Sequence, residues 1–87
     1  MENTTVNQRI AAFRKKLHYS QGAVAEMIGM KGSTYSQMER RGTVSAERLL
    51  KLARVFDIPP EMLLYDEEEY KKLYEGAEKE DWFGFDY

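Results

Sequence analysis

Two short helices joined by a tight turn are predicted by the stretch of sequence that begins at Ser20. Ser20 can cap the first helix, because its hydroxyl accepts a hydrogen bond from a first-turn N–H that lacks a helical partner. Val24, Ala25 and Ile28 then fall on one face at helical spacing. Gly29 follows at the place where helices commonly end in a left-handed residue, a conformation that glycine adopts at little cost.

The second helix of this pair, about residues 31–39, has one apolar side and one side of short polar groups. Met30 follows the turn and can fill the angle between the two helices, while Tyr35 and Met38 supply the apolar side. The remaining positions carry small or polar side chains: Lys31, Gly32, Ser33, Thr34, Ser36 and Gln37. A helix that exposes short hydrogen-bonding side chains suits the major groove of DNA.

The stretch resembles the helix-turn-helix of the phage-repressor-like family, also known as the XRE, lambda-repressor-like or Cro/C1-type family. The family signature is met by Gln21, Ala25, Gly29 and Met30, whereas Tyr35 stands where the family usually has Ile or Val. The resemblance continues on both sides of the motif, from about Asn7 to Leu64. It implies an all-α fold, a compact five-helix DNA-binding domain.

The chain divides into a helix-turn-helix domain, residues 1–65, and an acidic, aromatic C-terminal extension, residues 66–87. A first helix is expected from Thr5 or Asn7 to about Leu17. It is followed by the helix pair and then by a polar turn that contains two adjacent arginines and a glycine.

Two further helices are expected within the domain. Ser45 is the predicted cap of a fourth helix with a broad apolar face. Pro59 and Pro60 permit a new start, since proline is tolerated in the first turn, and residues 61–65 then form a short fifth helix. Residues 66–80 either extend that helix or form a sixth.

Charge is distributed unevenly along the chain. The net charge is −2, but residues 1–60 carry +5 and residues 61–87 carry −7. The first part therefore has the positive charge that a nucleic-acid surface attracts, and the second part does not. The hydrophobic share of 43% and the charged share of 32% fit a globular chain rather than a disordered one.

Catalysis, cofactor binding and metal binding are not predicted. The chain has no cysteine and a single histidine, His18, so neither a thiolate site nor a histidine-rich cluster can form. No glycine-rich phosphate loop follows a strand. No apolar run approaches the ~20 residues that span a bilayer, and the N-terminus lacks the apolar region of a signal peptide. We therefore expect a cytoplasmic protein that is not an enzyme and needs no membrane.

The resemblance implies two classes of DNA contact. Base-edge contacts are expected from the start of the second motif helix and from one turn later, namely Ser33, Gln37, Thr34 and Gly32. Phosphate contacts are expected from Gln21, Lys31, Ser36, Arg40 and Arg41. Gln37 is the strongest specificity candidate, because its amide can bond adenine N6 and N7 together. Gly32 lacks the long polar side chain that the family often has there.

An ion pair between Arg14 and Glu39 is also implied by the resemblance, since the family commonly pairs an arginine at this offset with a glutamate at the end of the recognition helix. The alternative interpretation is a solvated arginine on the surface of the first helix.

The C-terminal extension combines acidic and aromatic residues. Purely solvated acidic tails are usually poor in aromatics, so this one is predicted to dock on its own domain, on a dimer mate or on a different protein. The candidate residues for a dimer or partner surface are Met62, Leu63, Tyr70, Leu73, Tyr74, Trp82, Phe83 and Phe85. For the short fifth helix, the alternative is that it closes the monomer's own core.

These features favour a sequence-specific transcriptional regulator that binds double-stranded DNA, and more specifically a repressor on a palindromic operator. A homodimer is expected, because a single short recognition helix reads only a few base pairs. One alternative is an antitoxin-like or phage-encoded interaction protein, whose tail binds a partner protein while the domain regulates its own operon. A tail that mimics DNA within the same molecule, and a dimerisation scaffold without DNA binding, are the other two.

Overall fold

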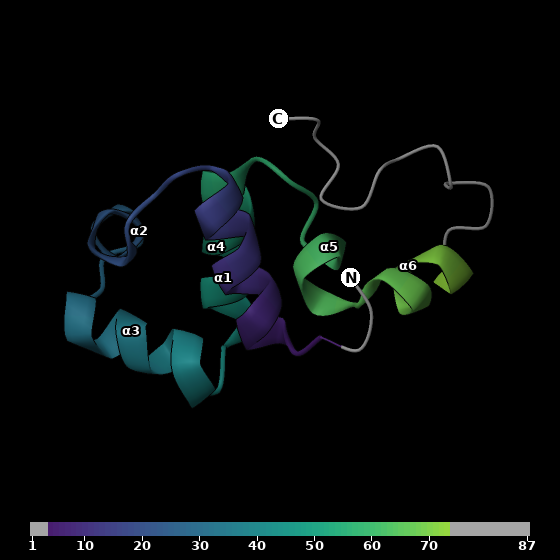
Figure 1. The fold of residues 1–87 in the computed structure, drawn as a ribbon, viewed down its shortest axis with the longest axis horizontal. Helices are drawn as coiled ribbons and strands as arrows, with labels where there is room; N and C mark the ends of the chain where they lie inside the picture. Colours follow the sequence, from purple (N-terminus) through teal and green to yellow (C-terminus); the bar gives the residue numbers. More distant parts are fainter. Residues whose placement is uncertain (1–3, 74–87) are drawn as a thin grey trace.

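The computed structural model describes residues 4–73, and this part of the chain is all-α (Figure 1). Its helices are α1 (Val6–Lys16), α2 (Gln21–Met27), α3 (Gly32–Arg41), α4 (Ala46–Phe56), α5 (Glu61–Leu64) and α6 (Glu67–Leu73). The predicted fold class is thereby confirmed. Of the helix expected in residues 66–80, α6 is the described part, and residues 74–80 lie outside the described residues. No helix in residues 4–73 is both long enough and apolar enough to cross a membrane.

Hydroxyl side chains determine where three of the helices begin. Thr5 forms a capping box with Gln8, in which Thr5 Oγ1 accepts from the Gln8 N–H at 3.1 Å and Gln8 Oε1 accepts from the Thr5 N–H at 3.0 Å. Ser20 Oγ accepts from the Ala23 N–H at 3.0 Å, and Ser45 Oγ accepts from an N–H of the first turn of α4 at 3.2 Å. The predicted caps at Ser20 and Ser45 are confirmed, and the first helix starts after Thr5.

Two glycines mark the ends of the motif helices for different reasons. Gly29 has a φ of 75°, in the left-handed region that a side chain disfavours. Gly42 has an ordinary φ of −78°, but a Cβ at this position would lie 2.7 Å from the Cα of Met38. Glycine is therefore required at 42 by close packing. The end of α3 differs from the prediction. Arg40 and Arg41 lie in the last turn of α3, whereas the sequence predicts a turn there.

The hydrophobic core lies between α1 and α4 and extends to α2, α3 and α5. Phe13 and Phe56 stack at its centre with ring centroids 6.3 Å apart. The largest fully buried side chains come from the first five helices: Tyr35, Phe13, Phe56, Ile10, Leu52, Leu63 and Val24. Each such side chain contributes about 1.5–3 kcal/mol by leaving water.

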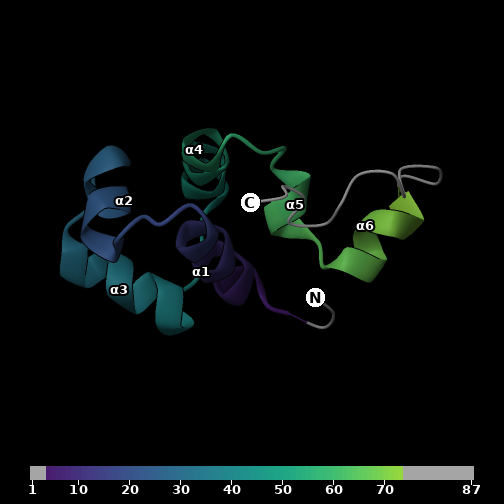
Figure 2. The same cartoon turned by 45° about the horizontal axis from the view of Figure 1, so that its top comes forward.

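The helix pair occupies one end of the described part, and α5 and α6 occupy the other (Figures 1 and 2). Helix α1 runs between them and packs against α3, α4 and α5. This arrangement leaves the outer side of α3 uncovered by any other described helix.

Three members of the predicted dimer or partner surface belong to the monomer's own core, which was the alternative for the fifth helix. Met62, Leu63 and Tyr70 are buried, and α5 packs against α1 and α4. Leu73 is exposed on α6. The other four residues of that set, Tyr74, Trp82, Phe83 and Phe85, lie outside the described residues.

Candidate nucleic-acid interface

Helix α3 is amphipathic, and its two sides are clearly separated. Tyr35, Met38 and Glu39 face the interior. The four predicted base-contact residues, Gly32, Ser33, Thr34 and Gln37, are all exposed. The outer side of α3 therefore presents the hydroxyl and amide groups that can bond base edges, with no bulky apolar side chain among them.

The predicted phosphate contacts surround that outer side. Lys31 is exposed before the first turn of α3, while Arg40 and Arg41 are exposed in its last turn. Cations at a helix C-terminus are also favoured by the helix dipole. Ser36 is half-buried, so less of its side chain is open to a ligand.

A shallow hollow of about 310 Å³ adds one residue that sequence reasoning missed. It is lined by residues from α3, the following loop and α4: Thr34, Gln37, Met38, Arg41, Gly42, Thr43 and Arg48. Arg48 belongs to α4, and sequence reasoning gave it only a position in the first turn of that helix. The hollow brings Gln37, Arg41 and Arg48 together at one surface, which no linear motif indicates.

The inner side of α3 is fixed by an ion pair with α1. Arg14 Nε donates to Glu39 Oε2 at 2.8 Å, and Arg14 Nη2 donates to Glu39 Oε1 at 3.0 Å. The two side chains are 10% and 5% exposed, so this is a buried bidentate pair and not a solvated arginine. Arg14 Nη1 also donates to the carbonyl of Tyr19 at 2.8 Å, which ties the start of the motif to α1.

Two more donors complete the coordination of the Glu39 carboxylate. Gln21 Nε2 donates to Oε1 at 2.8 Å, and the Tyr35 hydroxyl donates to Oε2 at 2.7 Å. With the two bonds from Arg14, the carboxylate accepts four hydrogen bonds, which is about its full capacity. The four residues Arg14, Gln21, Tyr35 and Glu39, here called the Glu39 network, therefore join α1, α2 and α3 at one point.

The pKa values in the Glu39 network follow from this geometry. Burial alone raises the pKa of the Glu39 carboxyl, but hydrogen bonds from Arg14, Gln21 and Tyr35 outweigh it, so the pKa is lowered. Desolvation and the bond to Glu39 raise the pKa of Tyr35, so the tyrosine remains a hydrogen-bond donor. The hydrogen bond to Glu39 likewise raises the pKa of Arg14. The network is thus held in a single protonation state near neutral pH.

Tyr35 and Gln21 take on roles here that the sequence did not predict. Tyr35 is fully buried, and its hydroxyl supplies a bond to Glu39 that Ile or Val at this position could not make. Gln21 is half-buried at the start of α2 with its amide nitrogen on Glu39. Its contact with a phosphate stays a prediction.

Asn7 is a second residue that positions α3, and sequence reasoning missed its role. Its Nδ2 group donates to the carbonyl of Gly42 at 2.7 Å and also to the carbonyl of Met38. These carbonyls lie at the C-terminal end of α3, where helical acceptors lack partners. Asn7 therefore fixes the end of α3 to the start of α1.

Arg9 contributes to the net positive charge of residues 1–60, but its side chain is buried away from α3. Its Nε and Nη2 groups donate to the carbonyls of Leu63 and Leu64 at 2.8 and 3.0 Å, and Nη1 donates to Thr4. Burial lowers the pKa of Arg9, although Asp66 and Glu69 act in the opposite direction. Arg9 thus caps the last turn of α5 and is not available to a nucleic acid.

Among the described residues no group of three or more His, Asp or Glu side chains could hold a metal ion. The surface around α3 is polar and cationic, and the Glu39 network lies beneath it on the inner side of the helix.

Comparison with known proteins places this geometry in a family. A helix-turn-helix family model matches residues 10–63. The chain is 37% identical over 65 residues to repressor protein C2 of Salmonella phage P22, a match that covers 74% of this chain and 30% of the relative's length. The chain therefore spans less than a third of that relative.

Solved structures give the same result. The N-terminal DNA-binding domain of SinR from Bacillus subtilis is 33% identical with a TM-score of 0.64, over 71% of this chain and 93% of that one. The P22 C2 repressor in complex with a synthetic operator is 34% identical with a TM-score of 0.62, over 71% and 96%. The complex of SinR with SinI is 32% identical with a TM-score of 0.64, over 86% and 80%. The chain belongs to the phage-repressor-like helix-turn-helix family.

Proposed function

We propose that this chain binds double-stranded DNA with sequence specificity and acts as a transcriptional repressor. The observation that carries the proposal is the exposed row of Ser33, Thr34 and Gln37 on α3, here called the reading row. The opposite side of that helix is held by the Glu39 network. A rigid helix with hydrogen-bonding side chains can align several of them with base edges at once. The likeness to a repressor solved on its operator supports the same use of α3.

Lys31, Arg40, Arg41 and Arg48 supply the sequence-independent part of the proposed affinity. They lie at both ends of the reading row, where α3 meets its neighbours. Contacts from such side chains to phosphates position a protein on the duplex and make binding weaken with salt. Base contacts from the reading row then select the sequence.

The proposed assembly is a homodimer on a palindromic site. One α3 helix reaches only a few base pairs, whereas two copies related by a two-fold axis read half-sites about 34 Å apart. The test is selection of bound duplexes from a random-sequence pool by the purified full chain. Enrichment of a palindrome with that half-site spacing is expected. Recovery of sequences without any common motif would contradict sequence-specific binding, and a single unrepeated half-site would contradict the dimer.

A second candidate function is binding to a partner protein, as an antitoxin-like regulator does. The likeness to SinR in its complex with SinI favours it, because that match covers 86% of this chain and so extends beyond the helix-turn-helix. Co-purification of the full chain with the products of neighbouring genes, compared with a chain ending at residue 65, tests this function. Equal recovery by both chains would contradict a tail-mediated partner.

A further inference from the structure

An apolar groove runs along α4 to α5, and at Gly42 and Thr43 it adjoins the hollow beside the reading row. Its larger part has a volume of about 660 Å³ and is lined mainly by apolar residues: Val6, Asn7, Gly42, Thr43, Val44, Ala46, Leu49, Leu50, Pro60 and Leu64. A second hollow of about 520 Å³ shares Leu50 and Pro60 with the first. The two hollows therefore form one continuous surface, here called the α4–α5 groove.

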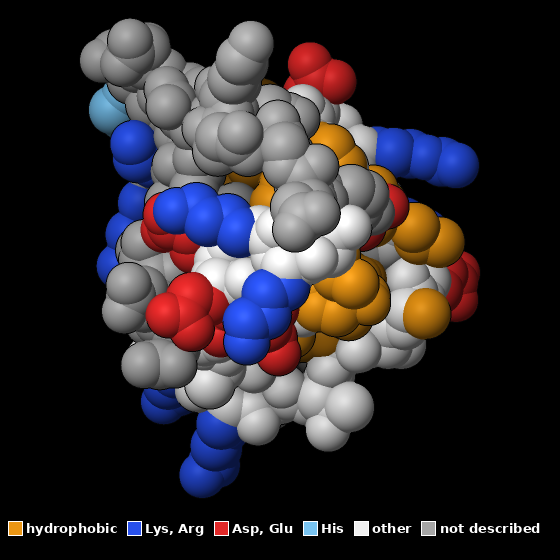
Figure 3. All heavy atoms as spheres, turned by 90° about the vertical axis from the view of Figure 1, so that its right-hand side faces the viewer, with side chains coloured by type: hydrophobic (Ala, Val, Ile, Leu, Met, Phe, Trp, Pro, Cys, Tyr) orange, Lys and Arg blue, Asp and Glu red, His pale blue; other side chains and the backbone are white. Residues whose placement is uncertain are grey.

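The rims of the α4–α5 groove are unusually apolar for a surface. Leu50 and Leu64 are 50% and 47% exposed. Hydrophobic side chains also gather on the face of the molecule that carries α5 and α6 (Figure 3). A docked segment would remove this apolar area from water, which is favourable.

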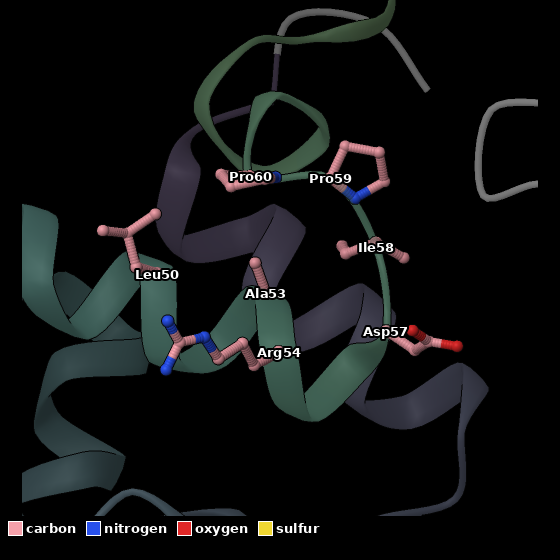
Figure 4. Close-up of a pocket in the computed structure, with 7 residues that line it drawn as sticks. All are labelled: Leu50, Ala53, Arg54, Asp57, Ile58, Pro59 and Pro60. Carbon is pink, nitrogen blue, oxygen red and sulfur yellow. The ribbon is translucent and has the colours of Figure 1, made fainter.

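The smaller hollow of the groove carries one cationic residue, Arg54, and one acidic residue, Asp57, and their side chains point in different directions. Figure 4 shows the Arg54 guanidinium on the Leu50 side of the hollow, whereas the Asp57 carboxylate lies on the opposite side. Within residues 4–73 the Arg54 guanidinium forms no ion pair. An occupant with aromatic and acidic side chains would match this surface.

The chain itself supplies an occupant of that composition immediately after α6. Residues 74–87 contain five aromatic residues, five acids and one lysine. The segment carries a net charge of −4. Aromatic side chains bury a large apolar area when they dock, and acids can remain at the rim.

The segment is long enough to reach the groove. Leu64 forms part of the groove, and α6 begins three residues later. Helix α6 is about 10 Å long at the usual rise per residue. From Leu73 to Trp82 the chain has nine residues, which span up to about 30 Å when extended. Tethering raises the effective concentration of such a segment to the millimolar range, so modest contacts suffice to hold it.

We propose that residues 74–87 dock in the α4–α5 groove of the same molecule, with the aromatic cluster around Trp82 against Leu50 and Leu64. The alternative place for an acidic tail is the reading row of α3, as a mimic of DNA. That surface offers short polar side chains and cations, but no apolar residue of α3 is exposed there to cover the aromatics. The groove is therefore the better match for the whole segment.

Trp82 is the only tryptophan of the chain, so its fluorescence reports directly on docking in the full chain without DNA. The folded wild type is expected to emit at shorter wavelength than the urea-unfolded chain and to resist quenching by iodide. Leu50→Glu should shift the emission to the unfolded value. Met27→Glu is the matched control, because Met27 is also 50% exposed but lies on α2, and it should leave the emission unchanged.

Leu64→Glu is a second groove variant with the same expected result, and folding of each variant is checked by circular dichroism. Three results would overturn the proposal. The first is wild-type emission equal to that of the unfolded chain. The second is blue-shifted emission that depends on protein concentration, which would assign the groove to a second copy's tail. The third is emission that survives both groove variants but is lost in Arg40→Glu, which would place the tail on the reading row. Because no DNA is present, each outcome is independent of the proposed repressor function.

Discussion

Four hydrogen bonds converge on the carboxylate of Glu39, and they come from α1, α2 and α3. At the scale of single residues, removal of either Arg14 or Glu39 alone is therefore expected to lower the stability of the fold strongly. Removing one partner leaves a buried charge without compensation, whereas replacing both with apolar groups of similar volume removes the charge altogether. The geometry of the outer side of α3 therefore depends on contacts made on its inner side.

Arg14→Met is expected to lower the free energy of unfolding by about 3–5 kcal/mol, because Glu39 keeps its charge in a buried site. Urea denaturation at pH 7 measures the change. The double variant Arg14→Met/Glu39→Leu should recover a large part of the loss. Lys51→Met is the control: it removes an exposed pair with Glu47 at 3.5 Å, which is worth less than about 0.5 kcal/mol. A loss for Arg14→Met no greater than that of the control would contradict the role of the pair.

Acid should weaken the fold partly through Glu39. Its pKa is lowered in the folded state, so the unfolded chain binds more protons than the folded one at moderately acidic pH. The stability that Glu39 contributes is present above the ordinary carboxyl pKa of about 4.3 and is lost as pH falls through the lower folded value. Urea denaturation between pH 7 and pH 3 should show a shallower acid dependence for Glu39→Gln than for the wild type. The exposed-site variant Glu47→Gln should retain the wild-type dependence, and equal curves for all three proteins would rule out the network as the source.

At the scale of the elements, α3 is positioned from its C-terminal end and from beneath. Asn7 fixes its C-terminal carbonyls, Gly42 allows the chain to leave it closely, and the Glu39 network fixes its inner side. The loop after α3 places Thr43 and Arg48 beside Thr34 and Gln37 of the reading row.

Gly42→Ala is expected to lower the free energy of unfolding by more than about 1 kcal/mol, because the new Cβ would collide with the backbone of Met38. Gly22→Ala is the matched control. Gly22 lies within α2, and a Cβ added there would meet nothing within 4 Å, so alanine should be neutral or stabilise by up to about 1 kcal/mol. Thermal denaturation of the two variants measures both effects. A stabilising effect of Gly42→Ala would show that the loop can shift without cost.

How much of the fold the sequence predicts depends on the range of the interactions involved. The caps at Ser20 and Ser45 and the turn at Gly29 follow from local rules, and the structure confirms them. The roles of Asn7, Arg9 and Arg48 depend on partners elsewhere in the chain, so no local pattern indicates them. Met62 and Leu63 pack in the monomer's own core, a choice that the sequence left open because an apolar face does not say which neighbour covers it.

At the scale of the whole molecule, the structure presents two adjoining surfaces with different chemistry. The outer side of α3 is polar and flanked by cations, and the α4–α5 groove is apolar. Leu50 and Leu64 line the groove but not the hollow at α3, and Gln37 and Arg41 line that hollow but not the groove, so substitutions at these residues alter one surface at a time.

The proposed reading of bases by α3 predicts that Gln37→Ala and Arg41→Ala act differently. Gln37→Ala should lower the preference for the selected duplex over random DNA by about 1–3 kcal/mol, because the bidentate contact with a base is lost. Arg41→Ala should weaken binding to both duplexes equally and reduce the salt slope by about one, because a phosphate contact is lost.

Base reading by α3 is tested by fluorescence anisotropy titrations of the full chain. The titrations use the selected duplex and a random duplex, each at two salt concentrations. The wild type should bind the selected duplex at least about a thousandfold more tightly than the random one. Gln37→Ala should reduce that ratio, and Arg41→Ala should leave it unchanged. Equal affinity of the wild type for both duplexes, or equal losses on both duplexes for Gln37→Ala, would contradict sequence reading by α3.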